Sequence, residues 1–368
     1  MKVEFSGFSY LPIDLKKLWK KQVDRVIDSG IFIGGEEVKC FEEQWSKLSG
    51  SSYSIGVSNG FDGLVLALRS LGIGAGTRVA VPAHTFIATW NSIIAVGAVP
   101  VGVDVDKDGL IDLDCFGELA QELDAVIPVH MHGSVVDMPK LYEICSNQSL
   151  STPIRIVEDA SQSHGALNPD GSKLGKYSDL VVYSLYPSKN LGALGDAGVI
   201  TTNSKEIEGK LRSLSNYGST LHDKYSHQYL GYNNRLDPIQ ASVLRINTEM
   251  LSQWNMRRKE LSELYIRELS EMIDILQVSH SESVRHHLCV LTRDRDALRQ
   301  YLLEREVKTE IHYPKVAGLE ALSFLNQNSS FPNSEYIATH TLSLPLSPWH
   351  NSEQVLYVID QIKTWVKR

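Results

Sequence analysis

Short apolar runs alternate with longer stretches of helical periodicity along most of this chain. Runs rich in β-branched residues predict four strands, at 78–82, 125–130, 154–159 and 180–186. Several of these runs are apolar at successive positions, which is typical of strands covered on both faces. Between them, residues 61–73 and 114–123 carry apolar side chains at helical spacing. The alternation predicts an α/β fold with a mainly parallel sheet.

The pattern changes near residue 245. Residues 245–272 form a charged, helix-like stretch without glycine or proline, which predicts a long connecting helix. Beyond it we expect a strand at 286–292, helices at 295–307 and 352–368, and a polar loop at 325–334. We therefore predict a large domain at 1–244, whose N-terminal segment is free to pack elsewhere, and a smaller α+β domain that includes the connecting helix at 245–368.

The composition is that of an ordinary soluble chain, with 368 residues, of which 42% are hydrophobic and 22% charged. A formal net charge of −8 argues against a nucleic-acid-binding surface, and a DNA-binding regulator would need a basic recognition helix. The basic run Arg257–Arg258–Lys259 is interpreted as a solvated helix face. We expect no nucleic-acid partner.

The four cysteines, at positions 40, 115, 145 and 289, lie far apart and predict neither a zinc cluster nor a disulfide framework. No signal peptide is evident, and no apolar run approaches the roughly 20 residues that span a bilayer. A cytoplasmic protein without a membrane partner is expected.

Polar residues occur where predicted strands end, and ligands of open α/β sheets gather at the carboxyl ends of parallel strands. Ser58–Asn59–Gly60 precedes an amphipathic helix, and the free N–H groups at a helix start form a phosphate site. An ordinary helix N-cap is the alternative for Asn59. The segment is therefore a candidate phosphate site.

Asp159 and Lys189 complete the candidate chemistry. Asp159 ends an apolar strand, and a buried carboxylate needs a cation, for which the pyridinium nitrogen of pyridoxal phosphate (PLP) is one candidate. A turn-capping role is the alternative. Lys189 follows Ser184 on a glycine-rich loop and could form a Schiff base with an aldehyde cofactor if its pKa is lowered. Otherwise Lys189 is a surface lysine.

Five ordered segments resemble one known family: Ser58–Asn59–Gly60, "PAHTFIAT" (82–89), "EDASQSHGA" (158–166), "SLYPSKN" (184–190) and "GYNNRLDPIQA" (231–241). The chain resembles the DegT/DnrJ/EryC1/StrS sugar aminotransferases. The resemblance extends over essentially the whole chain and implies the type I, or aspartate aminotransferase, fold of PLP-dependent transferases.

The resemblance also implies roles for individual residues. Lys189 would hold PLP as a Schiff base, Asp159 would face the pyridine nitrogen, Gln162 would lie beside the phenolic oxygen, and Phe86 would stack on the ring. Four residues would hold the phosphate, three from the same chain and one from a neighbouring subunit: Asn59, Gly60, Ser184 and the neighbour's equivalent of Asn233. A homodimer with shared active sites is implied.

The activity implied by the resemblance is transamination from L-glutamate to a nucleotide-linked keto sugar. The segment Gly195–Asp196–Ala197–Gly198 matches relatives that aminate C3 of dTDP-linked 3-keto-6-deoxyhexoses, in deoxyamino sugar biosynthesis for O-antigen or glycosylated products. The alternatives are a C4 aminotransferase, an enzyme for another nucleotide sugar or a keto-cyclitol, and a non-catalytic regulator that binds PLP or a nucleotide sugar. A dehydratase of this fold is disfavoured, because such relatives replace the Schiff-base lysine.

Tyr186, His312 and Tyr313 are candidate contacts to the sugar or the donor, and packing at a domain seam is the alternative. One departure concerns "HMHG" (130–133), where relatives often have His-Leu-Tyr-Gly, so that His132 replaces a tyrosine. We expect His130 and His132 to point the same way at the end of a strand. No third ligand is evident, so we expect no metal and a consequence for substrate shape instead.

Overall fold

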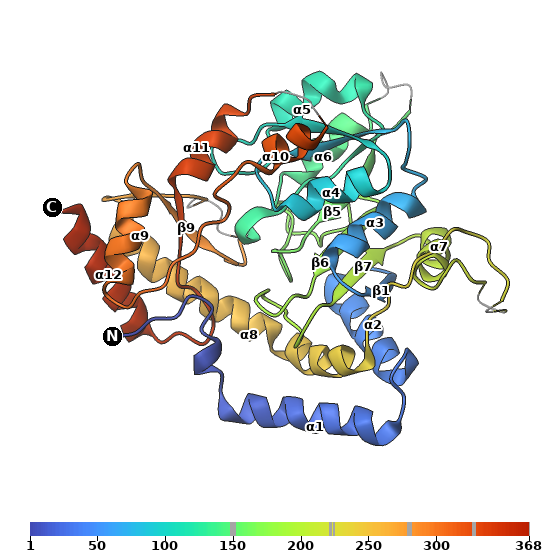
Figure 1. The fold of residues 1–368 in the computed structure, drawn as a ribbon, viewed down its shortest axis with the longest axis horizontal. Coiled ribbons are helices and arrows are strands. Elements are labelled where there is room, and N and C mark those ends of the chain that lie inside the picture. The colour runs from blue at the N-terminus through green and yellow to red at the C-terminus, as the bar shows by residue number, and fades with distance from the viewer. Residues whose placement is uncertain (148–151, 221–222, 224, 278–281, 326–328, 368) are drawn as a thin grey trace.

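The computed structural model in Figure 1 describes residues 1–147, 152–220, 223, 225–277, 282–325 and 329–367. Its larger sheet has the strand order β1-β7-β6-β5-β4-β2-β3. Strand β7 is antiparallel to β1 and β6, and the other neighbours are parallel. The strand bounds are β1 Tyr53–Val57, β2 Arg78–Pro82, β3 Val99–Val103, β4 Ala125–Val126, β5 Arg155–Asp159, β6 Leu180–Ser184 and β7 Gly198–Thr202. The predicted mainly parallel sheet is confirmed.

Helices cover both faces of this sheet, which explains why its strands are apolar at successive positions. One apolar core includes Trp45 of α2 (Gly35–Ser49) and Leu251 of α8 (Pro238–Leu269). The core on the opposite face includes Leu66 of α3 (Gly60–Ser70) and Trp90 of α4 (Ile87–Ala95). The remaining helices of the N-terminal two thirds are α1 Ile13–Ser29, α5 Leu113–Leu119, α6 Met138–Cys145 and α7 Lys205–Ser215, with 3₁₀ turns at Phe8–Tyr10, Ala120–Glu122 and Met131–Gly133.

The C-terminal part is built on a small antiparallel sheet of order β10-β9-β8. A third apolar core joins this sheet to α8 and to the last helices. The elements are β8 Asp274–Ile275, β9 Leu288–Leu291, α9 Arg295–Leu303, α10 Ala317–Phe324, α11 Pro332–His340, β10 Thr341–Leu344 and α12 Ser352–Val366. This arrangement agrees with the expected α+β character of the C-terminal part.

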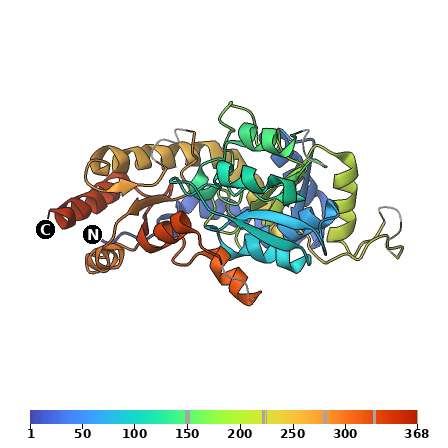
Figure 2. The same cartoon turned by 90° about the horizontal axis from the view of Figure 1, so that it is seen from above.

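The segment near the N-terminus packs with the C-terminal part. Val3 forms a parallel bridge with Val307 and belongs to the third core. Figure 2 shows both chain ends on the side of the molecule that holds α12. The domain division at residues 244 and 245, with an N-terminal segment free to pack elsewhere, stays a prediction.

Several element boundaries differ from those predicted. Helix α8 begins at Pro238 rather than at 245, because proline is well suited to the first position of a helix. The ladder of β4 ends at Val126, short of the predicted residue 130, since Pro128 has no N–H to donate. Helix α11 begins at Pro332, inside the predicted polar loop 325–334, of which residues 326–328 lie outside the described residues.

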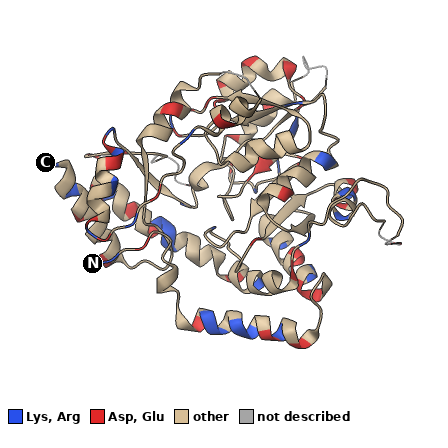
Figure 3. Ribbon diagram, viewed as in Figure 1, with Lys and Arg blue, Asp and Glu red and all other residues tan. Residues whose placement is uncertain are grey.

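The prediction that residues 257–259 form a solvated helix face is wrong for Arg258. Figure 3 shows charged residues of both signs spread over the outer helices, with Lys and Arg along α1. Arg258, however, is only 6% exposed, because its side of α8 packs against the segments that hold His286 and Leu346. Of the helices in the described ranges, none combines the length and apolarity needed to cross a membrane.

Candidate active site

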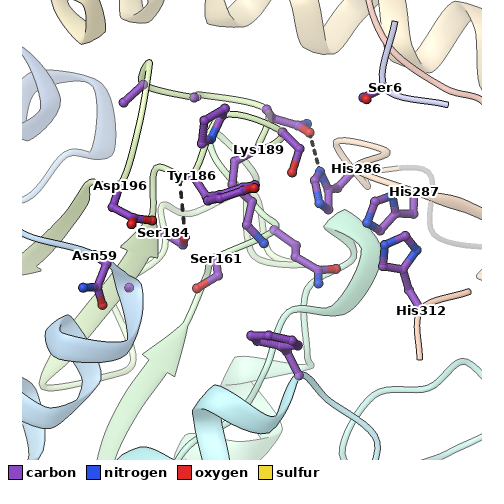
Figure 4. Close-up of a pocket in the computed structure, with 18 of the residues that line it drawn as sticks. Ser6, Asn59, Ser161, Ser184, Tyr186, Lys189, Asp196, His286, His287 and His312 are labelled. Atoms are coloured by element: carbon purple, nitrogen blue, oxygen red, sulfur yellow. Dashed lines mark hydrogen bonds between the residues drawn. The ribbon is translucent and has the colours of Figure 1, made fainter. Parts of the chain in front are cut away.

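A cavity of about 1050 Å³ lies where β5 and β6 end. Its walls come from the starts of α3 and α4, the loop after β6, part of α8, the start of β9 and the N-terminal segment. In Figure 4, Asn59, Ser184 and Lys189 lie on one side of the cavity, across from His286, His287 and His312. The cavity therefore gathers residues that lie far apart in the sequence.

Asp159 is held at the end of β5 with its carboxylate fixed by two donors. Thr89 Oγ1 donates to Oδ2 at 2.9 Å, and the N–H of Ser161 donates to Oδ1 at 3.1 Å. The side chain lines the cavity although the residue is only 5% exposed, and within the described ranges it forms no salt bridge. A buried carboxylate in this position is suited to pair with a cationic ring nitrogen.

Lys189 lies in the turn after β6, where its N–H bonds to the carbonyl of Tyr186 at 2.9 Å. Burial lowers the pKa of its ammonium group to about 8, and the Asp159 carboxylate partly offsets that effect. The lowered pKa makes the neutral, nucleophilic amine available near neutral pH, as a Schiff-base lysine requires. This geometry fits the predicted role of Lys189 and disagrees with a freely solvated surface lysine.

The start of α3 has the features of a phosphate site. The side chain of Asn59 accepts from the N–H of Asp62 at 2.8 Å, and the Asn59 carbonyl accepts from Gly63. The N–H groups of Gly60 and Phe61 thus keep no partner within the described ranges. Gly60 packs closely on the end of β6, since a Cβ there would lie 2.7 Å from Cβ of Ser184. Asn59, Gly60 and Ser184 are therefore brought together, as predicted.

Aromatic side chains line the mouth of the cavity. Phe86, the residue before α4, is 54% exposed, and its ring centroid lies 5.5 Å from that of Tyr313. Tyr186 is also exposed. An exposed phenylalanine inside a cavity leaves a ring face free for a flat ligand. Lys189, Asp159, Phe86 and the start of α3 together fit PLP.

Gln162 connects the cavity to the segment in which this chain departs from the family pattern. Its Oε1 accepts from the N–H of His132 at 2.6 Å, and its Nε2 donates to the hydroxyl of Tyr313 at 3.2 Å. His132 itself is buried, and its ring lies in an edge-to-face arrangement with that of His287, with centroids 5.8 Å apart. His132, where this chain differs from the family pattern, therefore lies next to the part of the cavity wall that Tyr313 and His287 form.

The expectation that His130 and His132 point the same way is wrong. Nε2 of His130 lies 2.8 Å from Glu158, whereas the ring of His132 lies near Cys289. The cause is a 3₁₀ turn at Met131–Gly133 in which His132 has a φ of +57°, so the alternation of a strand does not apply. In the described part of the chain, no three His, Cys, Asp or Glu residues form a metal site.

Several residues at the site were missed by the reading of the sequence. Thr89 lies in the segment 82–89, in which the family resemblance implies a role for Phe86 alone. His164 lies within 2.8 Å of the Ser184 carbonyl and is neutral, because burial lowers its pKa to about 3. Asn190, the residue after Lys189, is hydrogen-bonded to His286 at 2.9 Å. The adjacent histidines at 286 and 287 are the feature of the sequence that points to this part of the site.

His312 and Asn233 differ in their placement. His312 lines the cavity, stacks on His287 at 3.9 Å between centroids, and has a pKa lowered by burial to about 4. Asn233 is exposed, bridges Asn216, and does not line the cavity of its own chain. The single chain therefore brings together every predicted site residue except Asn233.

The fold and site together define a PLP-dependent enzyme of the aspartate aminotransferase type. The model of the DegT/DnrJ/EryC1/StrS aminotransferase family matches residues 14–363, and the chain belongs to this family. This finding confirms the family resemblance, the fold class, the cofactor and the transaminase activity expected from the sequence.

Three similar proteins illustrate the match. A dTDP-3-amino-3,4,6-trideoxy-alpha-D-glucose transaminase of Streptomyces venezuelae is 38% identical, over 94% of this chain and 91% of the relative. The structure of S. venezuelae DesV with a ketimine intermediate has a TM-score of 0.93, with 37% identity over 100% of this chain and 99% of that one. NtdA of Bacillus subtilis with bound cofactor PMP has a TM-score of 0.92, with 28% identity over 100% and 86% of the two chains.

Proposed function

We propose that this aminotransferase moves an amino group from L-glutamate to C3 of a dTDP-linked 3-keto-6-deoxyhexose. The observation that carries the proposal is the placement of Lys189 with a lowered pKa in the cavity that also holds Asp159. The choice of C3 is supported by the segment at 195–198 and by the S. venezuelae relative, which is named for a dTDP-3-amino sugar. Other nucleotide sugars and C4 amination are the alternatives.

Bound PLP supplies an electron-accepting ring that stabilises negative charge at the substrate carbon. Asp159 would keep the ring nitrogen protonated, because its buried carboxylate favours a cation there. Lys189 Nζ would take the proton from the substrate carbon that bears nitrogen and deliver it to the cofactor carbon joined to the same nitrogen, a general acid–base role worth roughly 10²–10⁴-fold in rate. A pKa near 8 suits Nζ to both directions of transfer.

The histidine side of the cavity would bind substrate without adding charge. His312 is neutral at pH 7 because burial lowers its pKa, so it would contact the sugar through uncharged hydrogen bonds. Tyr186 and Tyr313 offer hydroxyl groups at the same opening. We propose these three residues as contacts to the sugar or the donor, and a homodimer in which Asn233 of one subunit reaches the phosphate in the other.

The first test is a visible absorbance spectrum of the purified protein with PLP, before and after L-glutamate is added without an acceptor. We expect the lysine-bound cofactor band to be replaced by that of the pyridoxamine form. An unresponsive band would reject L-glutamate as donor, and a binding regulator would give that result with every amino donor.

The second test identifies the acceptor. The aminated protein is mixed in turn with dTDP-linked 3-keto and 4-keto 6-deoxyhexoses and with a UDP-linked 3-keto sugar. Return of the original band with the dTDP-linked 3-keto sugar, and an amine at C3 by NMR, would support the proposal. Faster return with either other sugar would replace the substrate proposed here.

A further inference from the structure

Arg258 is a buried cation in the cavity wall. It projects from the middle of α8 and is only 6% exposed, yet it is one of the residues that line the cavity. Its Nη1 donates to the carbonyls of His286 and Leu346, at 3.3 Å and 2.9 Å. These bonds fix the guanidinium between the start of β9 and the segment after β10.

The rest of the guanidinium lacks partners. Nε is buried and makes no hydrogen bond, and in the described part of the chain Nη2 has no acceptor and no carboxylate pairs with the guanidinium. Burial lowers the pKa of Arg258 to about 10, so the group stays charged at pH 7, and no acidic neighbour raises that pKa. A buried charge without a counter-ion is costly unless a ligand supplies one.

The other side chains of the cavity make Arg258 distinctive. Among the described residues that line the cavity, Lys189 and Arg258 are the two that carry a Lys or Arg side chain. Lys189 would be engaged by the cofactor aldehyde, which would leave Arg258 as the fixed cation available to a substrate. Both substrates of the proposed reaction are anionic, since glutamate carries two carboxylates and the nucleotide sugar carries a diphosphate.

Arg258 also lies near the reacting amine. It donates to the carbonyl of His286, whose ring is hydrogen-bonded to Asn190, the residue after Lys189. Burial is the main cause that lowers the pKa of His286 and of His164, and the charges of Lys189 and Arg258 lower both pKa values further. An anionic group bound by Arg258 would therefore lie in the same cavity as Lys189.

We propose that Arg258 binds an anionic group of a substrate through Nη2, a guanidinium nitrogen that has no hydrogen-bond partner in the described part of the chain. Hydrogen bonds from a charged guanidinium to carboxylate or phosphate oxygens are stronger than bonds between neutral groups, and a lysine does not reproduce the planar geometry of the guanidinium. The inference rests on the proposed function, because it assigns the residue to the substrates named there. The group bound is either a carboxylate of the amino donor or the diphosphate of the nucleotide.

The test compares R258K and R258Q with a matched control, R285Q. Arg285 is likewise buried, at 5% exposure, donates through Nη1 to Gln277 at 2.9 Å and has an unpartnered Nε, but it does not line the cavity. Circular dichroism and the cofactor band establish folding and PLP binding of each variant. Calorimetry then measures the affinity for thymidine diphosphate. The dependence of the spectral change on L-glutamate concentration measures the affinity for the amino donor separately.

We expect R258K and R258Q to weaken the binding of either thymidine diphosphate or L-glutamate by roughly 10- to 100-fold, because charge-assisted hydrogen bonds are lost. The affinities of R285Q for both ligands should stay within about twofold of wild type. Loss for glutamate alone identifies the donor carboxylate, and loss for thymidine diphosphate alone identifies the nucleotide. Unchanged binding of both in R258K would overturn the inference. If wild type binds thymidine diphosphate but ignores glutamate, the proposed donor fails, and the nucleotide arm still tests Arg258.

Discussion

Lys189 combines a loop position with a chemical task, and these two properties can be separated by substitution. In Lys189→Ala we expect loss of the lysine-bound cofactor band with retained folding, because a loop side chain contributes little packing and a desolvated charge is removed. The measurements are the visible spectrum and thermal unfolding followed by circular dichroism. Lys176→Ala, which removes an exposed lysine paired with Asp170, is the control and should keep the band. Full turnover by Lys189→Ala would exclude the proposed chemistry.

The lowered pKa of Lys189 predicts a pH dependence. Burial favours the neutral amine, so the amine is mostly protonated below pH 8 and mostly neutral above it. The rate at which cofactor-free protein captures PLP should rise as the pH approaches 8 and level off above that value. An unshifted lysine, with a pKa of about 10.4, would still be gaining rate at pH 9. Stopped-flow absorbance between pH 6 and 10 distinguishes the two profiles.

At the scale of one element, the N-terminus of α3 depends on close approach to β6. A Cβ at Gly60 would lie 2.7 Å from Cβ and 3.1 Å from Cα of Ser184, so Gly60→Ala must move the helix start away from the strand. We expect PLP affinity to fall by roughly tenfold, since the helix N–H groups would lose their alignment with the phosphate. Fluorescence titration with PLP measures the change.

Gly209→Ala is the control for that substitution. Gly209 lies inside α7, and a Cβ there would meet no atom within 4 Å. Alanine in a helix interior is more favourable than glycine by about 1 kcal/mol, so this variant should be at least as stable as wild type. PLP affinity in Gly209→Ala should be unchanged. Equal losses of affinity in both variants would show that α3 does not hold the phosphate through this contact.

The ends of the strands could be predicted from the sequence, because they depend on the local pattern of apolar and polar residues. A buried strand followed by a polar residue placed Asp159 and Ser184 at one sheet edge, and the structure places both beside the cavity. The environment of Arg258 could not be read, because its partner Leu346 is 88 residues away in sequence. The orientation of His132 was equally inaccessible, since it follows from one left-handed residue in a short turn.

For the whole molecule, the proposed shared site makes activity a property of two chains. Asn233 is exposed and does not line the cavity of its own chain, so we expect its amide to act in a neighbouring subunit. Asn233→Ala and Lys189→Ala should each form poorly active homodimers, whereas mixing should regenerate complete sites. About a quarter of all sites would be complete in a random mixture of dimers. Absence of recovery, with mixed dimers verified by mass spectrometry, would count against the shared site.

The pairing of Val3 with Val307 also has a consequence for the order of folding. The N–H of Val3 donates to Glu306, its carbonyl accepts from Lys308, and the Glu4 carbonyl lies 2.8 Å from Nε2 of His350. During synthesis the segment around Val3 leaves the ribosome early, while its partners emerge about 300 residues later. This segment also supplies Phe5 and Phe8 to the cavity wall. It therefore cannot pair with its partners until nearly all of the chain has been synthesised. The cavity is thus completed late in folding, after the sheet that carries Lys189 has had time to form.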